Sequence, residues 1–497
     1  MRLNYFFILL LISIQSCKTQ NVQNTESVKE TFFKEQEEIG TPAIKYIRNN
    51  FYKLYVLDES EFTSKIDSLK NIFTSHLKKY QSNLDKLTLN EEVININYLF
   101  DKYLLEYPQL HYEFTGEKIK TSKTNQLRIN HNLRKINDRK AYENKYFKNY
   151  IKSFLAIHSK KNMESGLYTG KDNQQLLADL NTVDSIFSNQ DVKCLWKGEY
   201  IYNHIDNMGV KSIDSIYNDF KISCKTSGIA NDINEIYNLH IRNRASHTIE
   251  FYKKVDGFNL EMHIFQPDTT TFKGKRPTIV YFHGGSWSQG KPDWFFETAK
   301  RYAQMGWVAT AVEYRIKGRH GTYPFDAVKD AKSAIRWLRE NSDRLNIDQN
   351  KILATGNSAG GHLSIATVLA DDWNEISDDL KTNAAPNFVI ANAAVYDLTT
   401  RSSNWIREYN QDTNLVNEIS PNELIKKTNT KFLLIHGEND RNCPYSTAET
   451  FYNKMKSLNN DVEIHKIPKA EHFIWYGKHS TEVENITAKY INEQNLE

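Results

Sequence analysis

The stretch ILATGNSAGGH, residues 352–362, decides the fold of this chain of 497 residues. Its first four residues are apolar or β-branched and predict a short buried strand, and the apolar run that follows Ser358 predicts a helix. A serine raised on a tight turn from strand to helix needs glycine two residues to either side, because the turn crowds the backbone. Gly356 and Gly360 stand at those positions. The stretch therefore predicts a nucleophilic Ser358 on such a turn.

Short apolar, β-branched runs alternate with longer helical patterns throughout the part of the chain that follows residue 245. The runs are 278–282, 308–312, 352–355, 388–391, 432–435 and 462–467, and helical patterns include 325–345 and 359–369. This alternation predicts a mostly parallel, doubly wound α/β sheet covered by helices on both faces. Residues 247–255 and 259–266, around Asp256-Gly257, predict a hairpin at its edge. We expect this domain to span residues 246–497.

A second glycine motif, HGGSW at residues 283–287, follows the predicted strand 278–282. Acyl transfer passes through a tetrahedral oxyanion, and glycine lets main-chain N–H groups approach that oxygen closely. We assign the oxyanion-hole donors to the backbone of Gly284 or Gly285 and of Ala359. His283 is interpreted as a brace of this loop and not as a catalytic base.

Five motifs in this order resemble those of the α/β-hydrolase superfamily: HGGSW at 283–287, AVEYR at 311–315, PFDAVKD at 324–330, AIRWL at 334–338 and GNSAGGH at 356–362. They are most similar to the esterase branch that includes carboxylesterases and feruloyl or acetyl-xylan esterase-like enzymes. The resemblance covers about residues 246–490 and implies ester hydrolysis through an acyl-serine, with no metal or organic cofactor.

Two residues depart from the pattern of that branch. Ser286 stands where many relatives have a third glycine, which leaves open which amide completes the oxyanion hole. Glu313 stands where relatives often have Asp, and we expect it to pair with Arg315.

A serine nucleophile needs a base, and the base needs an orienting carboxylate. In this fold the expected order along the chain is Ser, then the acid, then His. HGEND at residues 436–440 and EHF at 471–473 each follow a predicted strand. The family pattern puts the acid at Asp440 and the base at His472, and Asp397 remains an alternative acid.

Other titratable residues near these motifs have structural interpretations. Glu438 is expected in a turn, His465 inside a strand and His479 beyond the catalytic loop. His436 and His362 are assigned to packing, and Cys443 to a small buried side chain.

The amino terminus predicts export. Met1-Arg2 and an apolar run over 3–14 precede Cys17, a length that suits a signal peptide but not a permanent span. Cys17 directly after Ser16 resembles a bacterial lipoprotein cleavage box. We therefore expect a signal peptide with its lipidated Cys17 over 1–17 and a membrane-anchored, exported protein. A plain signal peptide or a signal anchor is the alternative. No acidic run follows Cys17, which favours the periplasmic side.

The region before residue 245 has a different composition. Only Pro42 and Pro108 lie in it, whereas 13 of the 20 glycines follow it. We expect a polar tether over 18–40 and a mostly α-helical domain of unknown role over 41–245. Cys194 and Cys224 either pair in an oxidising compartment or remain two buried thiols. No cysteine spacing indicates zinc.

Lys and Arg number 64 against 61 Asp and Glu, a formal charge of +3 that argues against a dedicated nucleic-acid binder. We expect a small-molecule or oligosaccharide ester as substrate, such as an acetyl or feruloyl ester of a carbohydrate. A cap over 371–421 would carry Trp373, Trp405 and Tyr409. The alternatives are a prolyl-oligopeptidase-like serine peptidase, which would need the Gly-rich blade repeats that the first 245 residues lack, and a non-catalytic binding lipoprotein.

Overall fold

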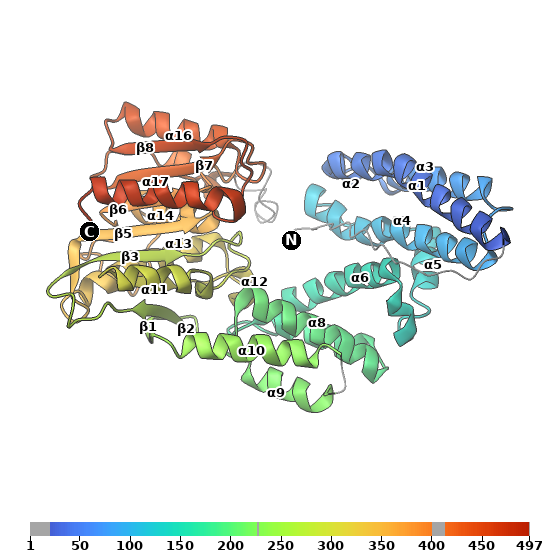
Figure 1. The fold of residues 1–497 in the computed structure, drawn as a ribbon, viewed down its shortest axis with the longest axis horizontal. Helices are drawn as coiled ribbons and strands as arrows, with labels where there is room; N and C mark the ends of the chain where they lie inside the picture. Colours follow the sequence, from blue (N-terminus) through green and yellow to red (C-terminus); the bar gives the residue numbers. More distant parts are fainter. Residues whose placement is uncertain (1–19, 226–227, 400–412, 497) are drawn as a thin grey trace. The chain divides into compact units, whose positions relative to one another are not determined.

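The computed structural model describes residues 20–225, 228–399 and 413–496. The predicted signal peptide with Cys17, and the cap residues Trp405 and Tyr409, lie outside the described residues. The chain forms two compact units, which divide between Phe154 and Leu155 (Figure 1). None of the described helices is both long enough and apolar enough to cross a membrane.

The first unit is a helical bundle. It contains α1 (Gln20–Asn49), α2 (Phe51–Tyr55), α3 (Glu59–Lys79), α4 (Lys86–Thr115), α5 (Lys123–Asn132), the 3-10 helix η1 (Arg139–Glu143) and the start of α6 (Lys145–Glu164). Its core is rich in aromatic side chains, among them Phe62 and Tyr107, whose rings stack with centroids 4.2 Å apart. The aromatic residues of this region therefore pack its interior.

The expected tether is wrong for the residues that the structure describes, because α1 begins at Gln20. Phe32 is fully buried, and its ring stacks on that of His76 with centroids 5.0 Å apart. Phe32, Ala43 and Ile47 line one side of α1 at helical spacing and join the core of the bundle. One buried aromatic side chain thus ties this polar stretch into the first unit.

Four further helices belong to the second unit, together with the sheet: α7 (Gln174–Ile186), α8 (Gln190–Met208), α9 (Asp214–Ser223) and α10 (Ala230–Arg244). The compact units therefore divide near residue 154 and not at the expected boundary of 245. Side chains explain the difference: Gln174 Nε2 donates to the His320 carbonyl at 2.8 Å, and Arg244 holds Glu261 through two hydrogen bonds of 2.9 Å. In Figure 1, α8 and α10 lie beside the β1–β2 edge of the sheet.

A disulfide joins two of these helices. Cys194 in α8 is bonded to Cys224 at the end of α9, with the Cα atoms 5.4 Å apart. Of the two alternatives that the spacing left open, the structure shows the bonded pair.

The sheet has eight strands in the order β1-β2-β4-β3-β5-β6-β7-β8. They are β1 (Thr248–Val255), β2 (Phe258–Phe265), β3 (Arg276–Phe282), β4 (Val308–Val312), β5 (Ile347–Asn357), β6 (Phe388–Asn392), β7 (Lys431–Gly437) and β8 (Val462–Ile467). β1 pairs antiparallel with β2, as does β2 with β4, and the other neighbours run parallel. The predicted α/β fold and its edge hairpin are confirmed.

Helices cover both faces of this sheet. The side chain of Val280 in β3 packs with α13 (Pro324–Glu340) and α14 (Ala359–Leu369), whereas its neighbour Ile279 packs on the other face with α11 (Phe296–Gln304) and α17 (Ser480–Glu493). α16 (Tyr445–Ser457) packs near β8. The alternation of side chains along each strand thus places two apolar cores around one sheet.

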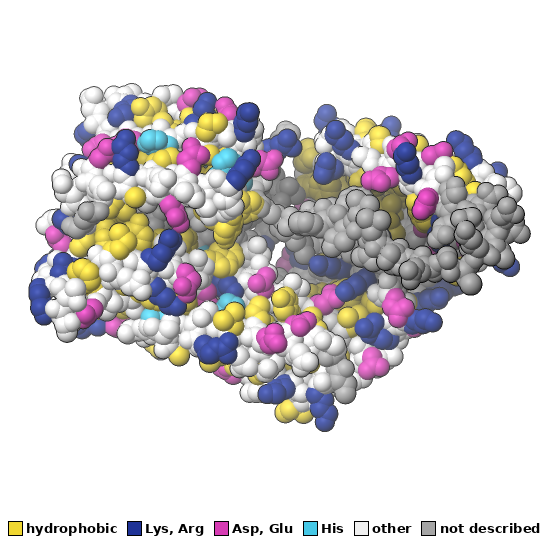
Figure 2. Space-filling view, viewed as in Figure 1, with side chains coloured by type: hydrophobic (Ala, Val, Ile, Leu, Met, Phe, Trp, Pro, Cys, Tyr) yellow, Lys and Arg dark blue, Asp and Glu magenta, His cyan; other side chains and the backbone are white. Residues whose placement is uncertain are grey.

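Charges of both signs are interspersed on the surface. Over the described part of the face seen in Figure 2, Lys and Arg lie among Asp and Glu without a large area of one sign. This distribution fits the near-zero formal charge of the sequence.

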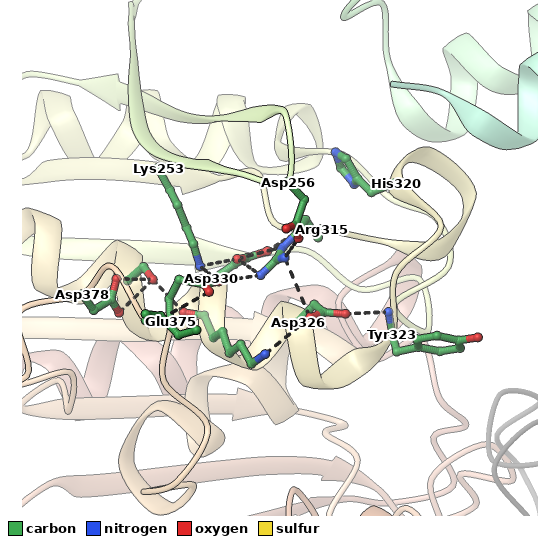
Figure 3. Close-up of polar contacts among 12 residues, drawn as sticks. Lys253, Asp256, Arg315, His320, Tyr323, Asp326, Asp330, Glu375 and Asp378 are labelled. Carbon is green, nitrogen blue, oxygen red and sulfur yellow. Dashed lines mark hydrogen bonds and ion pairs between the residues drawn. The ribbon is translucent and has the colours of Figure 1, made fainter. Parts of the chain in front are cut away.

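A buried ion-pair cluster fixes the loop that follows β4 (Figure 3). Arg315 is 2% exposed, and its guanidinium lies 2.9 Å from Asp330 of α13, 2.7 Å from Asp256 and 2.9 Å from Glu375. Lys253 of β1 reaches Asp330 at 2.6 Å. Burial alone would raise the pKa of Asp330, but the charges of Lys253 and Arg315 outweigh it and lower that pKa. The cluster joins β1, β4 and α13.

The expected pairing of Glu313 with Arg315 is wrong. Glu313 instead contacts Arg319 Nη1 at 2.8 Å and Lys211 Nζ at 2.6 Å. Lys211 lies just after α8, so the carboxylate of Glu313 faces the helices and Arg315 faces α13.

The disulfide yields a stability prediction. It closes a loop with a sequence separation of 30 residues, and a cross-link of that size stabilises the folded state by about 3–4 kcal/mol in the chain-entropy model. Replacing both Cys194 and Cys224 by Ala should lower the free energy of unfolding by this order, as measured by urea denaturation.

The matched control for this prediction is dithiothreitol. The reductant should destabilise the wild-type protein and leave the double variant unchanged. An equal response of both proteins would contradict the prediction.

Candidate active site

The turn after β5 places Ser358 in a strained conformation. Its backbone dihedrals are φ 56° and ψ −118°, and α14 begins at the next residue. A positive φ is uncommon for any residue other than glycine and persists only where surrounding structure enforces it. The N–H of Ser358 donates to the Asn392 carbonyl of β6 at 2.9 Å. The serine therefore stands on the strand-to-helix turn that the sequence predicted.

Backbone crowding explains the two flanking glycines. A Cβ atom on Gly360 would lie 1.9 Å from the carbonyl oxygen of Phe282, and one on Gly356 would lie 2.4 Å from the same oxygen. The end of β3 thus touches the turn directly, and no side chain fits between them.

The loop after β3 lies against the serine. A Cβ atom on Gly284 would lie 3.6 Å from Cβ of Ser358 and 2.9 Å from the Asn357 carbonyl oxygen. Gly285 follows with φ 105°, and Ser286 has φ 53°. The structure therefore brings the backbone of the predicted oxyanion loop to Ser358, and Ala359 places its own N–H at the amino end of α14. Ser286 occupies a left-handed conformation in which a glycine would carry no strain.

His283 braces this loop. It is 1% exposed, and burial lowers its pKa to about 4. Its Nδ1 lies 2.8 Å from the Gly284 carbonyl, and its ring stacks on Tyr314 with centroids 4.2 Å apart. The Tyr314 hydroxyl donates to the His283 carbonyl at 2.6 Å. These contacts agree with a structural role.

The structure brings Asp440 and His472 together. His472 Nδ1 lies 2.7 Å from Asp440 Oδ2, and both side chains are buried. The loops that carry them are joined by a hydrogen bond of 2.8 Å from the Asn439 N–H to the Ala470 carbonyl. With Nδ1 donating to the carboxylate, Nε2 is the ring nitrogen that can accept a proton.

Asp440 has further donors around it. Its Oδ1 accepts the N–H groups of Asn442 and Cys443, each at 2.8 Å. His436 Nε2 lies 3.3 Å from Oδ2. Burial alone would raise the pKa of Asp440, but the hydrogen bonds from His436 and His472 outweigh it and hold that pKa well below its ordinary value. The carboxylate therefore stays ionised.

His436 is the residue of this site that sequence reasoning missed. Its Nε2 also lies 2.7 Å from the Cys443 carbonyl, so it does brace the loop, as predicted, but it faces the acid as well.

The rival residues lie in other contacts. Asp397 Oδ1 accepts the N–H and hydroxyl of Thr399 at 2.8 and 2.5 Å. His362 Nε2 lies 2.7 Å from the Ile419 carbonyl, and Glu438 accepts the Lys469 N–H at 2.9 Å. Asp440 and not Asp397 is thus the carboxylate in contact with His472.

One group of described residues has donor atoms close enough to hold a metal ion. Atoms of Asp440, Cys443 and His472 lie within 4.8 Å of one another. Both oxygens of Asp440 already accept hydrogen bonds, so a cation would have to displace the contact between Asp440 and His472. The arrangement fits an acid and base pair better than a metal site.

Aromatic side chains follow His472. Phe473 is 39% and Tyr476 is 59% exposed, and their rings stack with centroids 6.2 Å apart. A hollow of about 620 Å³ beside Asp440 is lined by Tyr445, Glu449 and Glu471, among others. Trp373, which the sequence placed in a cap, packs on Phe325 with ring centroids 4.5 Å apart.

Known proteins resemble this part of the chain. Residues 262–455 match the family model BD-FAE. Esterase LipC of Mycobacterium tuberculosis is 26% identical over 213 residues, 39% of this chain and 52% of that protein. An arylesterase of Saccharolobus solfataricus is 30% identical over 168 residues, 33% of this chain and 50% of that protein. The chain spans about half the length of these curated relatives.

Two further matches are to a protein that is not named an esterase and to a solved structure. The mouse acylamino-acid-releasing enzyme is 25% identical over 235 residues, 43% of this chain and 31% of that protein. The solved structure of esterase 2 of Thermogutta terrifontis is 29% identical, with a TM-score of 0.48, and the match covers 51% of this chain and 96% of that one.

The matched family model begins in β2 and ends in α16, so it includes the turn at Ser358 and the loop at Asp440. Together with the sheet order and the nucleophile turn, this match shows an α/β-hydrolase fold in the C-terminal half of the chain, whose sequence is similar to the BD-FAE family and to proteins named as esterases.

Proposed function

We propose that this protein is a serine hydrolase that cleaves carboxylic esters through an acyl-serine intermediate. The observation that carries the proposal is the 2.7 Å contact between His472 and Asp440. These two residues follow strands β8 and β7 of the same sheet in which β5 ends directly before the strained Ser358. Parallel strands gather such residues at their carboxyl ends. The relatives named as esterases support the same reaction.

Each member of this triad has one task in the proposed reaction. His472 Nε2 takes the proton of the Ser358 hydroxyl as its oxygen attacks the ester carbonyl, and Asp440 stabilises the resulting imidazolium. The tetrahedral intermediate collapses, the alcohol leaves with the proton from His472, and water then hydrolyses the acyl-serine with His472 as base.

The backbone supplies the oxyanion hole in this proposal. The N–H of Ala359 and that of Gly284 or Gly285 would donate to the carbonyl oxygen as it becomes negative. The position of Gly284 beside Ser358 supports this assignment. Loss of one such donor raises the barrier by roughly 3 kcal/mol in other hydrolases.

We further propose a carbohydrate ester, carrying an acetyl or feruloyl group, as the substrate. The exposed rings of Phe473 and Tyr476 next to His472 support it, because aromatic faces stack well on sugar rings and on aromatic acyl groups.

We also propose that the protein is exported as a lipoprotein, anchored through Cys17 and facing the periplasm. The Cys194–Cys224 disulfide supports an oxidising compartment.

A peptidase is the second candidate, favoured by the match to the mouse acylamino-acid-releasing enzyme. Peptidases of the prolyl-oligopeptidase kind place a β-propeller upstream of the hydrolase domain. Here the described residues 20–225 and 228–245 contain helices and no strand. Ester hydrolysis is therefore preferred over peptide hydrolysis as the proposed function.

Ser358→Ala should abolish turnover of a short-chain aryl acetate, with kcat lower by a factor of about 10⁴ or more, because the nucleophile is gone. The measurement is p-nitrophenol release. Ser364→Ala, on the following helix, is the matched control and should retain activity. Turnover that persists in Ser358→Ala would refute the assignment.

A fluorophosphonate probe separates an active hydrolase from a binding protein on the same scaffold. It should label the wild-type chain at Ser358 and leave Ser358→Ala unlabelled. A wild-type chain that is folded but unlabelled would favour the binding protein.

His436→Asn should destabilise the protein in a pH-dependent way. The variant lacks the imidazole that donates to Asp440, so the pKa of Asp440 rises toward its ordinary value near 4. The free energy of unfolding at pH 7 should fall by about 2 kcal/mol. A lowered carboxylate pKa stabilises the fold above the unfolded value, and this contribution is lost as the pH falls through the folded value. The gap in unfolding free energy should therefore shrink below about pH 4. Urea denaturation at several pH values measures it, and a constant gap would count against the proposal.

Tyr476→Ala should raise KM for feruloylated or acetylated oligosaccharides about fivefold, since a lost ring contact is worth about 1 kcal/mol. Turnover of p-nitrophenyl acetate should stay unchanged. Phe251→Ala is the control, because Phe251 is 63% exposed on β1 at the opposite edge of the sheet. Equal effects of the two variants on oligosaccharide esters would remove the support for a carbohydrate substrate.

A further inference from the structure

The carboxyl end of α8 contacts the loops that follow β3 and β4. The Asn207 carbonyl accepts the N–H of Gly290 at 3.0 Å. The Ile205 carbonyl accepts from Lys291 Nζ at 3.0 Å, and the Met208 carbonyl accepts from Arg319 Nη2. Three carbonyls in the last turn of this helix are thus bound by groups of the hydrolase domain.

Helix geometry makes this contact favourable. The last carbonyls of an α-helix lack partners within the helix and carry a partial negative charge. Here this applies to Asn207 and Met208, whereas the Ile205 carbonyl also accepts the Gly209 N–H at 3.0 Å. Lys291 and Arg319 bring two cations to that end, and both are buried, at 5% and 4% exposure. Because buried polar groups without partners are costly, the helix end and the two cations constrain each other.

Lys291 is held by a second set of contacts. Its Nζ lies 3.1 Å from Nε2 of His240 in α10, and His240 Nδ1 lies 2.6 Å from Asp293. A buried chain of polar groups therefore runs from Asp293 through His240 and Lys291 to the Ile205 carbonyl.

The same loop carries the proposed oxyanion donors. A Cβ atom on Gly290 would lie 2.2 Å from His283 Nδ1 and 2.5 Å from the Gly284 carbonyl oxygen. The Gly285 carbonyl accepts the N–H groups of Ser288 and Gln289 at 3.0 and 3.1 Å. One end of this compact loop thus lies beside Ser358 at Gly284, and its other end is bound to α8 through Gly290.

We propose that the carboxyl end of α8 positions the oxyanion hole, with Lys291 and Arg319 as positioning residues. The inference rests on the proposed ester hydrolysis. It gives a role in the reaction to helices of a region for which sequence alone predicted none.

The variant Lys291→Met, made in the full chain, tests whether Lys291 positions the oxyanion hole. The oxyanion develops only in the transition state, so a displaced donor should lower kcat and leave KM nearly unchanged. We expect kcat for p-nitrophenyl acetate to fall about 10- to 100-fold, with a change in KM below about twofold. Lys291→Arg, which keeps a cationic donor, should restore most of kcat.

Lys332→Met is the matched control. Lys332 is a buried lysine of the same unit, and it donates to the carbonyls of Ala370 and Asp371 at the end of α14. Burial lowers the pKa of both lysines to about 8. Both methionine variants should lose stability, but Lys332→Met should keep kcat within about twofold of the wild type. An equal loss of kcat in both variants, or none in Lys291→Met, would overturn the inference.

Two outcomes are kept apart by the design. If Lys291→Met does not fold, Arg319→Lys weakens the other anchor while keeping its charge and should lower kcat by a smaller factor; an unchanged kcat would overturn the inference. A folded wild type without ester turnover would overturn the proposed function together with the inference, whereas turnover that survives Lys291→Met overturns the inference alone.

Discussion

The close approach of two backbone segments is the constraint on which the rest of this domain depends. A Cβ atom at position 360 would lie only 1.9 Å from the Phe282 carbonyl oxygen, so any side chain there would push β3 away from the nucleophile turn. The loop that follows Phe282 is the one that supplies N–H groups to the substrate oxygen in the proposed reaction. A single glycine contact therefore sets both the position of Ser358 and the distance from which the backbone can act on it.

Local motifs made much of this fold predictable. The glycines around Ser358 and the hairpin at Asp256 are short patterns whose structure depends on neighbours in sequence, whereas the acid and the base were assigned through the resemblance to α/β-hydrolases. The contact of His472 with Asp440 follows from the order of the strands, because β7 and β8 are adjacent and parallel. The local residues of such a motif are enough to predict the structure that it forms.

Contacts between segments far apart in the chain could not be predicted from the sequence. Glu313 pairs with Lys211, which lies 102 residues away, and no local pattern distinguishes this partner from Arg315. Scarce glycine and proline correctly indicated helices before residue 245, but helix content does not tell which unit a helix belongs to. Phe32 shows the same limit, since one buried ring within a polar stretch decides whether that stretch is a linker or a helix.

The disulfide between α8 and α9 has a practical consequence for anyone who produces this protein. A bacterial cytosol keeps thiols reduced, so a chain made there would lack the covalent link that holds Cys194 of α8 to the end of α9. Weak activity of such a preparation would report on its redox history and would say little about the chemistry of Ser358. Secretion into an oxidising compartment, with a count of free thiols before assay, is the sound route to material whose kinetics can be interpreted.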